Sequence, residues 1–356
     1  MIFRQMFEPV SGTYSYLLAS RRGGEALIID PVLEKVDRYL QLLRELQLNL
    51  VKAVDTHLHA DHITGLGALR DRTHCITVMG EQSNVDVVSM RVADGDQLEV
   101  EGLALDVIYT PGHTDDSYSF LCGDRVFTGD TLLIRGTGRT DFQNGDPRAQ
   151  YDSLFSRLLK LPDETLVYPA HDYKGDTVST IREERAYNPR LQVKSAEEYV
   201  DLMSNLNLTN PKMMDVALPA NTHQGLSQEQ IARRGWAYSA EEAKALIGES
   251  DIALIDLREK RERERHGNIP GALHLPYHDL QENISASGVL RTLAAAGKSL
   301  LFYCAFGERS AMAVQAAQDA GINAARHIEG GIDAWKKAGG SLDSGSGSPV
   351  HPLLRA

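Results

Sequence analysis

Residues 56–65 read Thr56-His57-Leu58-His59-Ala60-Asp61-His62-Ile63-Thr64-Gly65. Three histidines and one aspartate fall within the six residues from His57 to His62. Imidazole and carboxylate groups at this density are typical of a metal site. The apolar run 50–54 precedes the cluster and predicts a buried strand, so we expect the cluster in a loop that leaves a strand end. A surface histidine patch without a metal is the alternative at this point.

Length and charge restrict the classes of protein to which the chain can belong. At 356 residues it exceeds the size of a typical single domain, so two domains are expected. The formal net charge of −12 at pH 7 argues against nucleic acid or an anionic membrane as a partner. No apolar run approaches the length that spans a bilayer.

The first residues and the cysteines both favour a reducing compartment. Residues 1–7 are too short and too interrupted for a signal peptide, and strand-like sequence follows at once. We therefore expect a cytoplasmic protein. Three cysteines, Cys75, Cys122 and Cys304, do not make a disulfide framework. Cys75 and Cys122 are expected to be structural thiols.

Strand-like and helix-like segments alternate in two different ways along the chain. Residues 1–225 mix hairpin patterns with helical periods, which predicts sheets packed face to face with helices outside. Residues 226–237 are expected to be a linker. From 238 to 340 strands and helices alternate as in a small α/β domain with a parallel sheet. Residues 341–356 are rich in Gly, Ser and Pro and are expected to form a flexible tail.

Three further ligand-type residues occur at predicted strand ends. They are His113 in Pro-Gly-His-Thr, Asp130 in Thr-Gly-Asp, and His171 in Pro-Ala-His-Asp. One loop histidine carries little information. Together with the 57–62 cluster, however, this series favours ligands gathered around a metal at one edge of a sandwich.

The ligand series resembles that of the metallo-β-lactamase fold. The HxHxDH cluster, the Gly-His and Gly-Asp pairs and the final histidine match its ligand positions. The resemblance implies an α+β protein with an αββα sandwich. In that family the series fills two zinc sites that hydrolyse substrates with a metal-activated water. The two sites would take His57, His59 and His113, and Asp61, His62 and His171, with Asp130 as the bridge.

A closer resemblance, over residues 1–225, is to the persulfide dioxygenase branch of that family. It is carried by TGDTLLIRGTGRTDF at 128–142, PAHDY at 169–173, VSTIREER at 178–185 and MSNLNL at 203–208. In that branch a single iron(II) is held by two histidines and one carboxylate, which leaves positions open for substrate and oxygen. The matching ligands here are His57, His113 and Asp130. The residues then expected around them, orienting ligands or holding water, are His59, Asp61, His62 and His171.

The resemblance implies the oxidation of glutathione persulfide by O2 to sulfite and glutathione. Removing four electrons from the outer sulfur requires a redox-active metal, which zinc is not. Residues expected to bind the anionic glutathione are Arg139, Tyr173 and Arg182. For each of them, a structural ion pair or a core hydroxyl is the alternative. Because the full ligand set also suits two zinc ions, the runner-up is a zinc thioesterase of the glyoxalase II type, which cleaves S-acylglutathione without oxygen.

A second chemical motif follows the apolar run 301–303. It reads Cys304-Ala305-Phe306-Gly307-Glu308-Arg309-Ser310 and precedes a predicted helix. A strand that ends in cysteine and turns into a helix points backbone N–H groups at the sulfur. Together with the helix dipole, this geometry predicts a lowered pKa for Cys304. Arg309 is expected to brace the loop or to bind an anion.

This motif resembles the active-site loop of the rhodanese sulfurtransferases. Supporting segments are IDLRE at 255–259, HGNIPGA at 266–272 and GGIDAW at 330–335, so the resemblance covers 238–340. Four residues separate Cys304 from Arg309, one fewer than in the cysteine-arginine phosphatases, and the smaller loop suits a persulfide sulfur better than a phosphate. Cys304 is then the nucleophile that moves sulfur from thiosulfate or a persulfide to glutathione.

The two halves together resemble a persulfide dioxygenase fused to a rhodanese. Its expected small-molecule partners are glutathione persulfide, glutathione, thiosulfate and O2. The sequence leaves open homo-oligomerisation, the preferred sulfur donor, the direction of sulfur transfer and direct passage of persulfide between the sites. The alternative from another class is a non-catalytic sulfur carrier or sensor, in which Cys304 stores sulfur.

Overall fold

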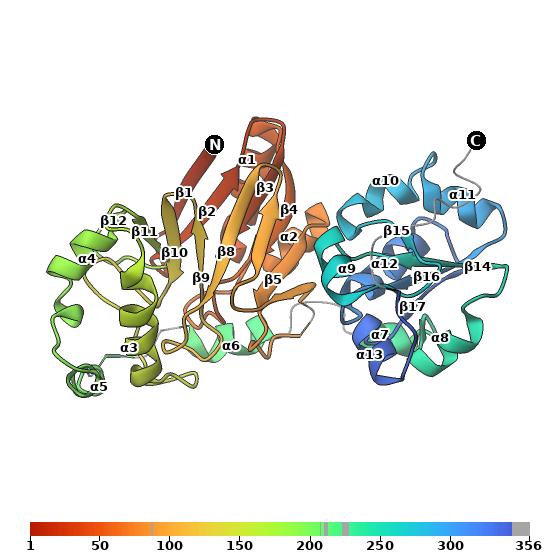
Figure 1. The fold of residues 1–356 in the computed structure, drawn as a ribbon. Coiled ribbons are helices and arrows are strands. Elements are labelled where there is room, and N and C mark those ends of the chain that lie inside the picture. Colours follow the sequence, from red (N-terminus) through yellow and green to blue (C-terminus); the bar gives the residue numbers. More distant parts are fainter. Residues whose placement is uncertain (87, 207, 210–212, 223–227, 344–356) are drawn as a thin grey trace. The chain divides into compact units, whose positions relative to one another are not determined.

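The computed structural model describes residues 1–86, 88–206, 208–209, 213–222 and 228–343. Contacts between Cα atoms divide the chain into two units, Met1–Gln224 and Gly225–Ala356 (Figure 1). The range 226–237, expected to be a linker, contains the helix α7 (Gln228–Arg233). Of the expected tail at 341–356, residues from 344 onward lie outside the described part of the chain.

Two six-stranded sheets form the first unit. The first sheet has the order β1-β2-β3-β4-β5-β6, with antiparallel pairing up to β3 and parallel pairing beyond it. Its strands are β1 (Ile2–Glu8), β2 (Thr13–Ala19), β3 (Glu25–Ile29), β4 (Asn49–Val54), β5 (Ile76–Gly80) and β6 (Met90–Val92). The second sheet has the order β12-β11-β10-β9-β8-β7, and β10 and β11 pair in parallel. Its strands are β7 (Gln97–Val100), β8 (Leu103–Tyr109), β9 (Tyr118–Cys122), β10 (Arg125–Gly129), β11 (Leu166–Pro169) and β12 (Ser179–Thr180).

Aromatic rings fill the space between these two sheets. Phe3 and Tyr16 of the first sheet contact Phe127 and Tyr168 of the second, with ring centroids 4.9–6.2 Å apart. Such offset and tilted ring pairs contribute about 0.5–1.5 kcal/mol each beyond their buried area. The inner faces of both sheets are therefore apolar, as a sandwich requires.

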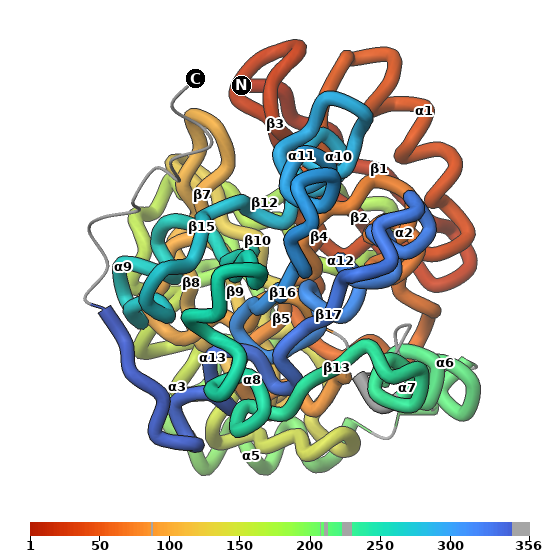
Figure 2. The backbone as a smooth tube through the Cα atoms, turned by 90° about the vertical axis from the view of Figure 1, so that its right-hand side faces the viewer, coloured from red at the N-terminus to blue at the C-terminus, as the bar shows by residue number. Residues whose placement is uncertain are grey.

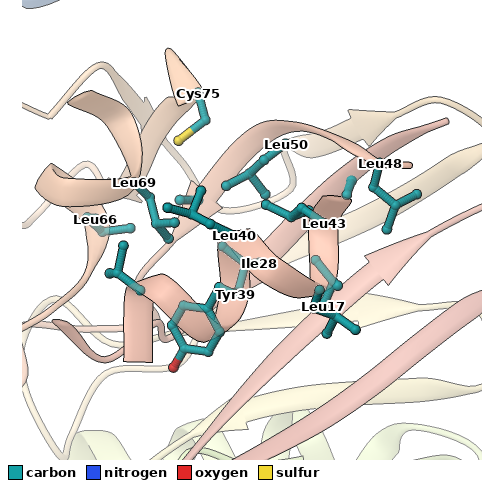
Figure 3. Packing of buried hydrophobic residues seen from close by; sticks show 14 of the residues in the cluster. Leu17, Ile28, Tyr39, Leu40, Leu43, Leu48, Leu50, Leu66, Leu69 and Cys75 are labelled. Carbon is teal, nitrogen blue, oxygen red and sulfur yellow. The ribbon is translucent and has the colours of Figure 1, made fainter. Parts of the chain in front are cut away.

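Helices cover the outer faces of the sandwich. The apolar residues of α1 (Val36–Leu46) recur at helical spacing, and they pack with α2 (Leu66–Thr73) on the first sheet (Figure 3). The second sheet packs against α3 (Pro147–Ser156), α4 (Ile181–Tyr187) and α5 (Ala196–Ser204), and α6 (Met214–Thr222) follows them in the chain. Short 3-10 turns lie at Leu33–Lys35, Leu158–Lys160 and Pro189–Leu191. The predicted αββα sandwich is confirmed.

A five-stranded parallel sheet forms the second unit, in the order β13-β17-β16-β14-β15. Its strands β13, β15, β16 and β17 are labelled in Figure 2. Its strands are β13 (Ala237–Tyr238), β14 (Ile252–Asp256), β15 (Leu273–His274), β16 (Ser299–Tyr303) and β17 (Ala325–Ile328). Its helices after α7 are α8 (Ala240–Leu246), α9 (Lys260–His266), α10 (Leu280–Ile284), α11 (Val289–Ala295), α12 (Glu308–Asp319) and α13 (Gly331–Lys337), with a 3-10 turn at Tyr277–Asp279. The core contains Leu254, Leu301 and Trp335. The predicted small α/β domain is also confirmed.

None of the helices in the described ranges is long and apolar enough to cross a bilayer.

Candidate metal centre and cysteine loop

Four strands of the first unit deliver the ligand-type residues. His57 follows β4, His113 follows β8, Asp130 follows β10 and His171 follows β11. Donor atoms of His57, His113 and Asp130 lie within 4.8 Å of one another. Both histidines are buried, whereas 12% of the Asp130 side chain is exposed. The Asp130 carboxylate is therefore the most exposed of the three side chains, although most of it is buried.

Hydrogen bonds fix the orientation of the two histidine rings. His113 Nδ1 lies 2.6 Å from the carbonyl oxygen of Arg139, which can only accept, so the proton is on Nδ1. Thr56 Oγ1 donates to Asp30 Oδ2 and therefore accepts from His57 Nδ1 at 2.9 Å. In the neutral form of either ring, Nε2 then carries the lone pair. Burial lowers the pKa of His57 well below its usual value, which also keeps this ring neutral.

These features fit a bound metal ion. A histidine binds a metal through an unprotonated ring nitrogen, and its other N–H is usually fixed by a carbonyl or hydroxyl oxygen. His113 Nε2 lies 3.6 Å from Asp130 Oδ2, so one imidazole and one carboxylate face each other at ligand spacing. Two imidazoles and one carboxylate form a donor set that suits iron(II) as well as zinc.

A second donor group lies beside the first. It comprises His59, Asp61, His62 and His171, whose donor atoms are also within 4.8 Å of one another. His171 joins the two groups, with Nδ1 2.7 Å from Asp130 Oδ1 and Nε2 2.8 Å from Asp61 Oδ2. Burial opposes a charge on His171, but the two carboxylates outweigh it and hold the pKa of His171 well above its usual value. Both ring nitrogens of His171 thus contact carboxylates.

Two buried aspartates that the sequence analysis did not single out, Asp30 and Asp55, lie beside His59 of the histidine loop. Asp30 Oδ1 accepts from Thr56 N at 2.7 Å and lies 3.1 Å from His59 Nε2. Burial raises the pKa of Asp55 to about 8. Both residues follow strand ends, at β3 and β4, and that position is the signal by which they could have been found.

Asn221 of α6 holds the same loop from its other side. Its Nδ2 donates to the carbonyl oxygens of His59 at 2.9 Å and His62 at 2.8 Å, and its Oδ1 accepts from Thr64 N at 2.9 Å. The side chain is buried, so these bonds are protected from water. No periodicity or motif in the surrounding sequence indicated this role.

Gly138 brings two of the candidate ligands together. Its N–H donates to the carbonyl oxygen of Asp130 at 2.6 Å. A Cβ at this position would lie 2.3 Å from that oxygen and 2.8 Å from His113 Nδ1. Any side chain would therefore push the Asp130 backbone and the His113 ring apart.

The three residues expected to bind glutathione lie in different settings. The Tyr173 ring stacks on the His171 ring, with centroids 6.1 Å apart and an interplanar angle of 7°, and Tyr173 is 74% exposed. Arg139 pairs with Asp141 at 2.5 and 2.6 Å, and its carbonyl oxygen holds His113. Arg182 is 62% exposed and forms ion pairs with acidic residues at 163 and 164. Tyr173 is thus in direct contact with the donor groups, while both guanidinium groups are already paired.

Cys304 lies at the end of β16 and is fully buried. The backbone N–H of Gly307 donates to Cys304 Sγ at 3.1 Å, and its φ of +103° is open to glycine without strain. Arg309 is also fully buried and pairs with both carboxylate oxygens of Glu262 at 2.6 and 2.8 Å. This ion pair links the first turn of α12 to α9, and both roles expected for Arg309 stay predictions.

The expectation of a lowered Cys304 pKa is wrong for this structure. Complete burial raises the pKa of the thiol, and the positive charge of Arg309 opposes this shift only in part. Arg309 forms an ion pair with Glu262, and the negative charge of Glu262 offsets much of the stabilisation that Arg309 would give to a Cys304 thiolate. Cys75 and Cys122 are also buried and free, and burial raises the pKa of Cys75 to about 12.

Comparisons with known proteins find a different family model within each of the two units. The family model for the metallo-beta-lactamase superfamily matches residues 9–83 and 79–171. The model for the rhodanese-like domain matches residues 239–338.

Three of the proteins to which this chain is similar illustrate its relationships. "Persulfide dioxygenase ETHE1, mitochondrial" from Homo sapiens is 48% identical over 229 residues, which cover 64% of this chain and 89% of that protein. The crystal structure of ETHE1 from Myxococcus xanthus is 55% identical with a TM-score of 0.61, and it covers 62% of this chain and 98% of its own. Hydroxyacylglutathione hydrolase from Haemophilus ducreyi is 31% identical over 221 residues, which cover 53% of this chain and 92% of that protein.

Proposed function

This chain belongs to the persulfide dioxygenase family and carries a C-terminal rhodanese-like domain, and from that membership we propose that it is a bifunctional enzyme of sulfur metabolism. The first proposed reaction converts glutathione persulfide, O2 and water into glutathione and sulfite. The outer sulfur loses four electrons, and one O2 accepts them, so the reaction balances without a further reductant. The second proposed reaction transfers sulfane sulfur between thiosulfate and glutathione through Cys304.

The observation that carries the first proposal is the orientation of the ring nitrogens. His57 and His113 each donate from Nδ1 to a protein oxygen, which leaves two Nε2 lone pairs near the Asp130 carboxylate. These three residues would hold a single iron(II). When bound, iron(II) supplies the redox chemistry between O2 and a sulfur atom that zinc lacks.

The neighbouring donors are assigned to positioning. His171 holds Asp130 through Nδ1, which orients the carboxylate toward the two histidines. His59 is held in turn by Asp30, and His62 by Asp61 at 2.9 Å. Tyr173, exposed and stacked on His171, is the group best placed to meet glutathione. Arg139 would have to leave Asp141 to bind a carboxylate, so its role in substrate binding stays a prediction, as does that of Arg182.

The second site would work by exchange of one sulfur atom. The Cys304 thiolate attacks the sulfane sulfur of thiosulfate, a bond from Sγ to that sulfur forms, and sulfite leaves with the electron pair of the broken S–S bond. The thiolate of glutathione then attacks the outer sulfur of the Cys304 persulfide, which releases glutathione persulfide and restores Cys304. The product of the second site is therefore the substrate of the first. The cytoplasm is the compartment we propose for both reactions.

Oxygen uptake on glutathione persulfide, with the metal identified in the same sample, tests the proposal. We expect a single iron per chain and one O2 consumed for each persulfide. Stoichiometric zinc without oxygen uptake would overturn the dioxygenase. Hydrolysis of S-acylglutathione by that sample would support the second candidate, the glyoxalase II type thioesterase, which the similarity to hydroxyacylglutathione hydrolase favours.

A further inference from the structure

His327 at the end of β17 lies in the interior of the second unit, and the proposed reactions do not use it. The residue is fully buried. Its Nδ1 lies 3.2 Å from Ser310 Oγ. Its Nε2 has no hydrogen-bond partner among the described residues. A polar ring without exposure and with one unpartnered nitrogen is unusual in a protein core, because burial of an unsatisfied polar atom is costly.

Ser310 stands between His327 and the candidate nucleophile. It lies in the first turn of α12 and is fully buried. Its Oγ is 3.0 Å from the carbonyl oxygen of Gly307 and 3.7 Å from Cys304 Sγ. A hydroxyl has one proton to donate, and three acceptors compete for it here: the Gly307 oxygen, the sulfur and, in one tautomer, His327 Nδ1.

The surroundings of His327 select the tautomer. With the proton on Nε2, the ring would bury an N–H group without an acceptor and would take the Ser310 proton for Nδ1. With the proton on Nδ1, the ring donates to Ser310 Oγ, and only a lone pair on Nε2 is left unpartnered. Orphaned buried N–H groups are the rarer defect in proteins, so the second arrangement is favoured. Burial lowers the pKa of His327 to about 4, which keeps the ring neutral near pH 7.

We propose that His327 is a positioning residue for Cys304: its Nδ1–H donates to Ser310 Oγ, which holds this oxygen beside the sulfur and aims the hydroxyl proton at it. This inference rests on the proposed role of Cys304 as the nucleophile. While the sulfur is a neutral thiol, the hydroxyl donates to the Gly307 oxygen. When the sulfur carries a negative charge, as thiolate or persulfide, that charge draws the hydroxyl proton to it.

The charged groups near Cys304 do not replace this contact. Arg309 and Glu308 of α12 both act on the sulfur, with opposite effects on its charge. Arg309 is bonded to Glu262 of α9. Asp333 of α13, whose backbone N–H donates to the carbonyl oxygen of Ala305, pairs with Lys337 at 2.8 Å. Because these charges largely cancel one another, the Ser310 hydroxyl is a neutral donor that can stabilise a negative charge on the sulfur.

The test is the pH dependence of Cys304 alkylation by iodoacetamide in the full-length chain, with the modified residue assigned by mass spectrometry. His327→Leu removes the donor that holds Ser310 Oγ, so we expect it to raise the midpoint by about one pH unit, a roughly ten-fold loss of thiolate at a given pH. His327→Asn, whose amide nitrogen can replace Nδ1, should keep the midpoint close to that of the wild-type chain. His274→Asn is the matched control, because His274 contacts a backbone carbonyl, that of Arg258, instead of Ser310.

The double variant decides whether His327 acts through Ser310. Ser310→Ala alone should raise the midpoint, and adding His327→Leu should shift it no further. An unchanged midpoint in Ser310→Ala, an unchanged midpoint in a folded His327→Leu chain, or a further shift in the double variant would each overturn the proposal. Alkylation requires no sulfur donor, so these results can be read even if the wild-type chain transfers no sulfur. Failure of transfer in the wild-type chain would instead overturn the proposed function.

Discussion

The metal centre and the cysteine loop are built in opposite ways. The ligand-type residues of the metal centre come from four separate strand ends, and buried carboxylates surround their imidazoles. The cysteine loop is one continuous segment, residues 304–310, which leaves β16 and runs into the first turn of α12. The ion pair of Arg309 with Glu262 weakens the effect of the arginine charge on the sulfur. The first site therefore depends on the assembly of two sheets, whereas the second depends on one local turn. The two sites should fail independently.

Removal of the metal should produce the largest difference between the activities of the two sites. Treatment with an iron chelator should abolish oxygen uptake on glutathione persulfide, because His57, His113 and Asp130 alone supply no redox chemistry. Sulfur transfer from thiosulfate to glutathione should be unchanged. Iron(II) should restore oxygen uptake, and zinc should not. Parallel loss of both activities would show that the sites are not independent.

The reverse experiment is Cys304→Ser. A serine hydroxyl cannot carry sulfane sulfur as a persulfide, so transfer from thiosulfate should fall to the uncatalysed rate. Oxidation of supplied glutathione persulfide should stay close to the wild-type rate in an oxygen electrode. Cys122→Ser, at a buried thiol of the first unit, is the matched control for loss of a cysteine. A large decrease of oxygen uptake in Cys304→Ser would contradict the separation.

Acid should destabilise the second unit through His327. The pKa of this residue in the folded chain is about 4, below the value of about 6.5 for an unfolded histidine. The unfolded state binds the proton first, so stability falls as the pH decreases from about 6.5 to about 4 and is fully present above that range. The shift corresponds to about 3 kcal/mol of unfolding free energy. The chain has two tryptophans, Trp236 and Trp335, and both are in this unit, so denaturant unfolding followed by their fluorescence measures the effect.

His327→Asn is the variant that isolates this contribution. Its stability should lose most of the dependence on pH between about 4 and about 6.5. An equal dependence in His327→Asn and wild type would assign the effect to another group.

Asn221→Ala should weaken the metal centre without removing a ligand. The change leaves the carbonyl oxygens of His59 and His62 and the Thr64 N–H without their buried partner. Loss of such a supporting contact typically lowers metal affinity about 10- to 100-fold. Competition for iron(II) with a chelating dye measures the change. Asn205→Ala, at an exposed asparagine of the first unit, should leave the affinity as it is.

The sequence predicted the parts of both sites that are local. His57, His113 and Asp130 were among the residues that stand after predicted strands, and the family resemblance selected them as the ligands. The structure brings their donor atoms together, and their role as ligands stays a prediction. Cys304 and Arg309 belong to one short segment with a characteristic spacing. The sandwich and the parallel sheet followed from the two patterns of alternation, and both are confirmed.

The parts that were missed depend on packing between distant segments. Asn221 reaches the histidine loop across more than 150 residues of sequence, in a stretch without periodicity. Asp30 was visible only as the residue that ends a strand. The direction of the Cys304 pKa shift was wrong because the local loop was considered without its burial and without Glu262, which compensates Arg309. A motif predicts which residues carry the chemistry, but the tertiary structure is needed to predict the burial and the charges that set their pKa values.

The origin of the ligands on two different sheets has a consequence for the lifetime of the protein. His57 leaves the first sheet, while His113 and Asp130 leave the second, so an ion bound by all three would cross-link the two halves of the sandwich. A ligand that binds only the folded state stabilises it by about 2.7 kcal/mol at a hundred times its dissociation constant. Iron starvation should then accelerate degradation of the chain as well as abolish its oxidation of persulfide. The abundance of the protein would follow the iron supply. Proteolysis of the first unit at controlled free iron(II) measures this link, and equal rates with and without iron would refute it.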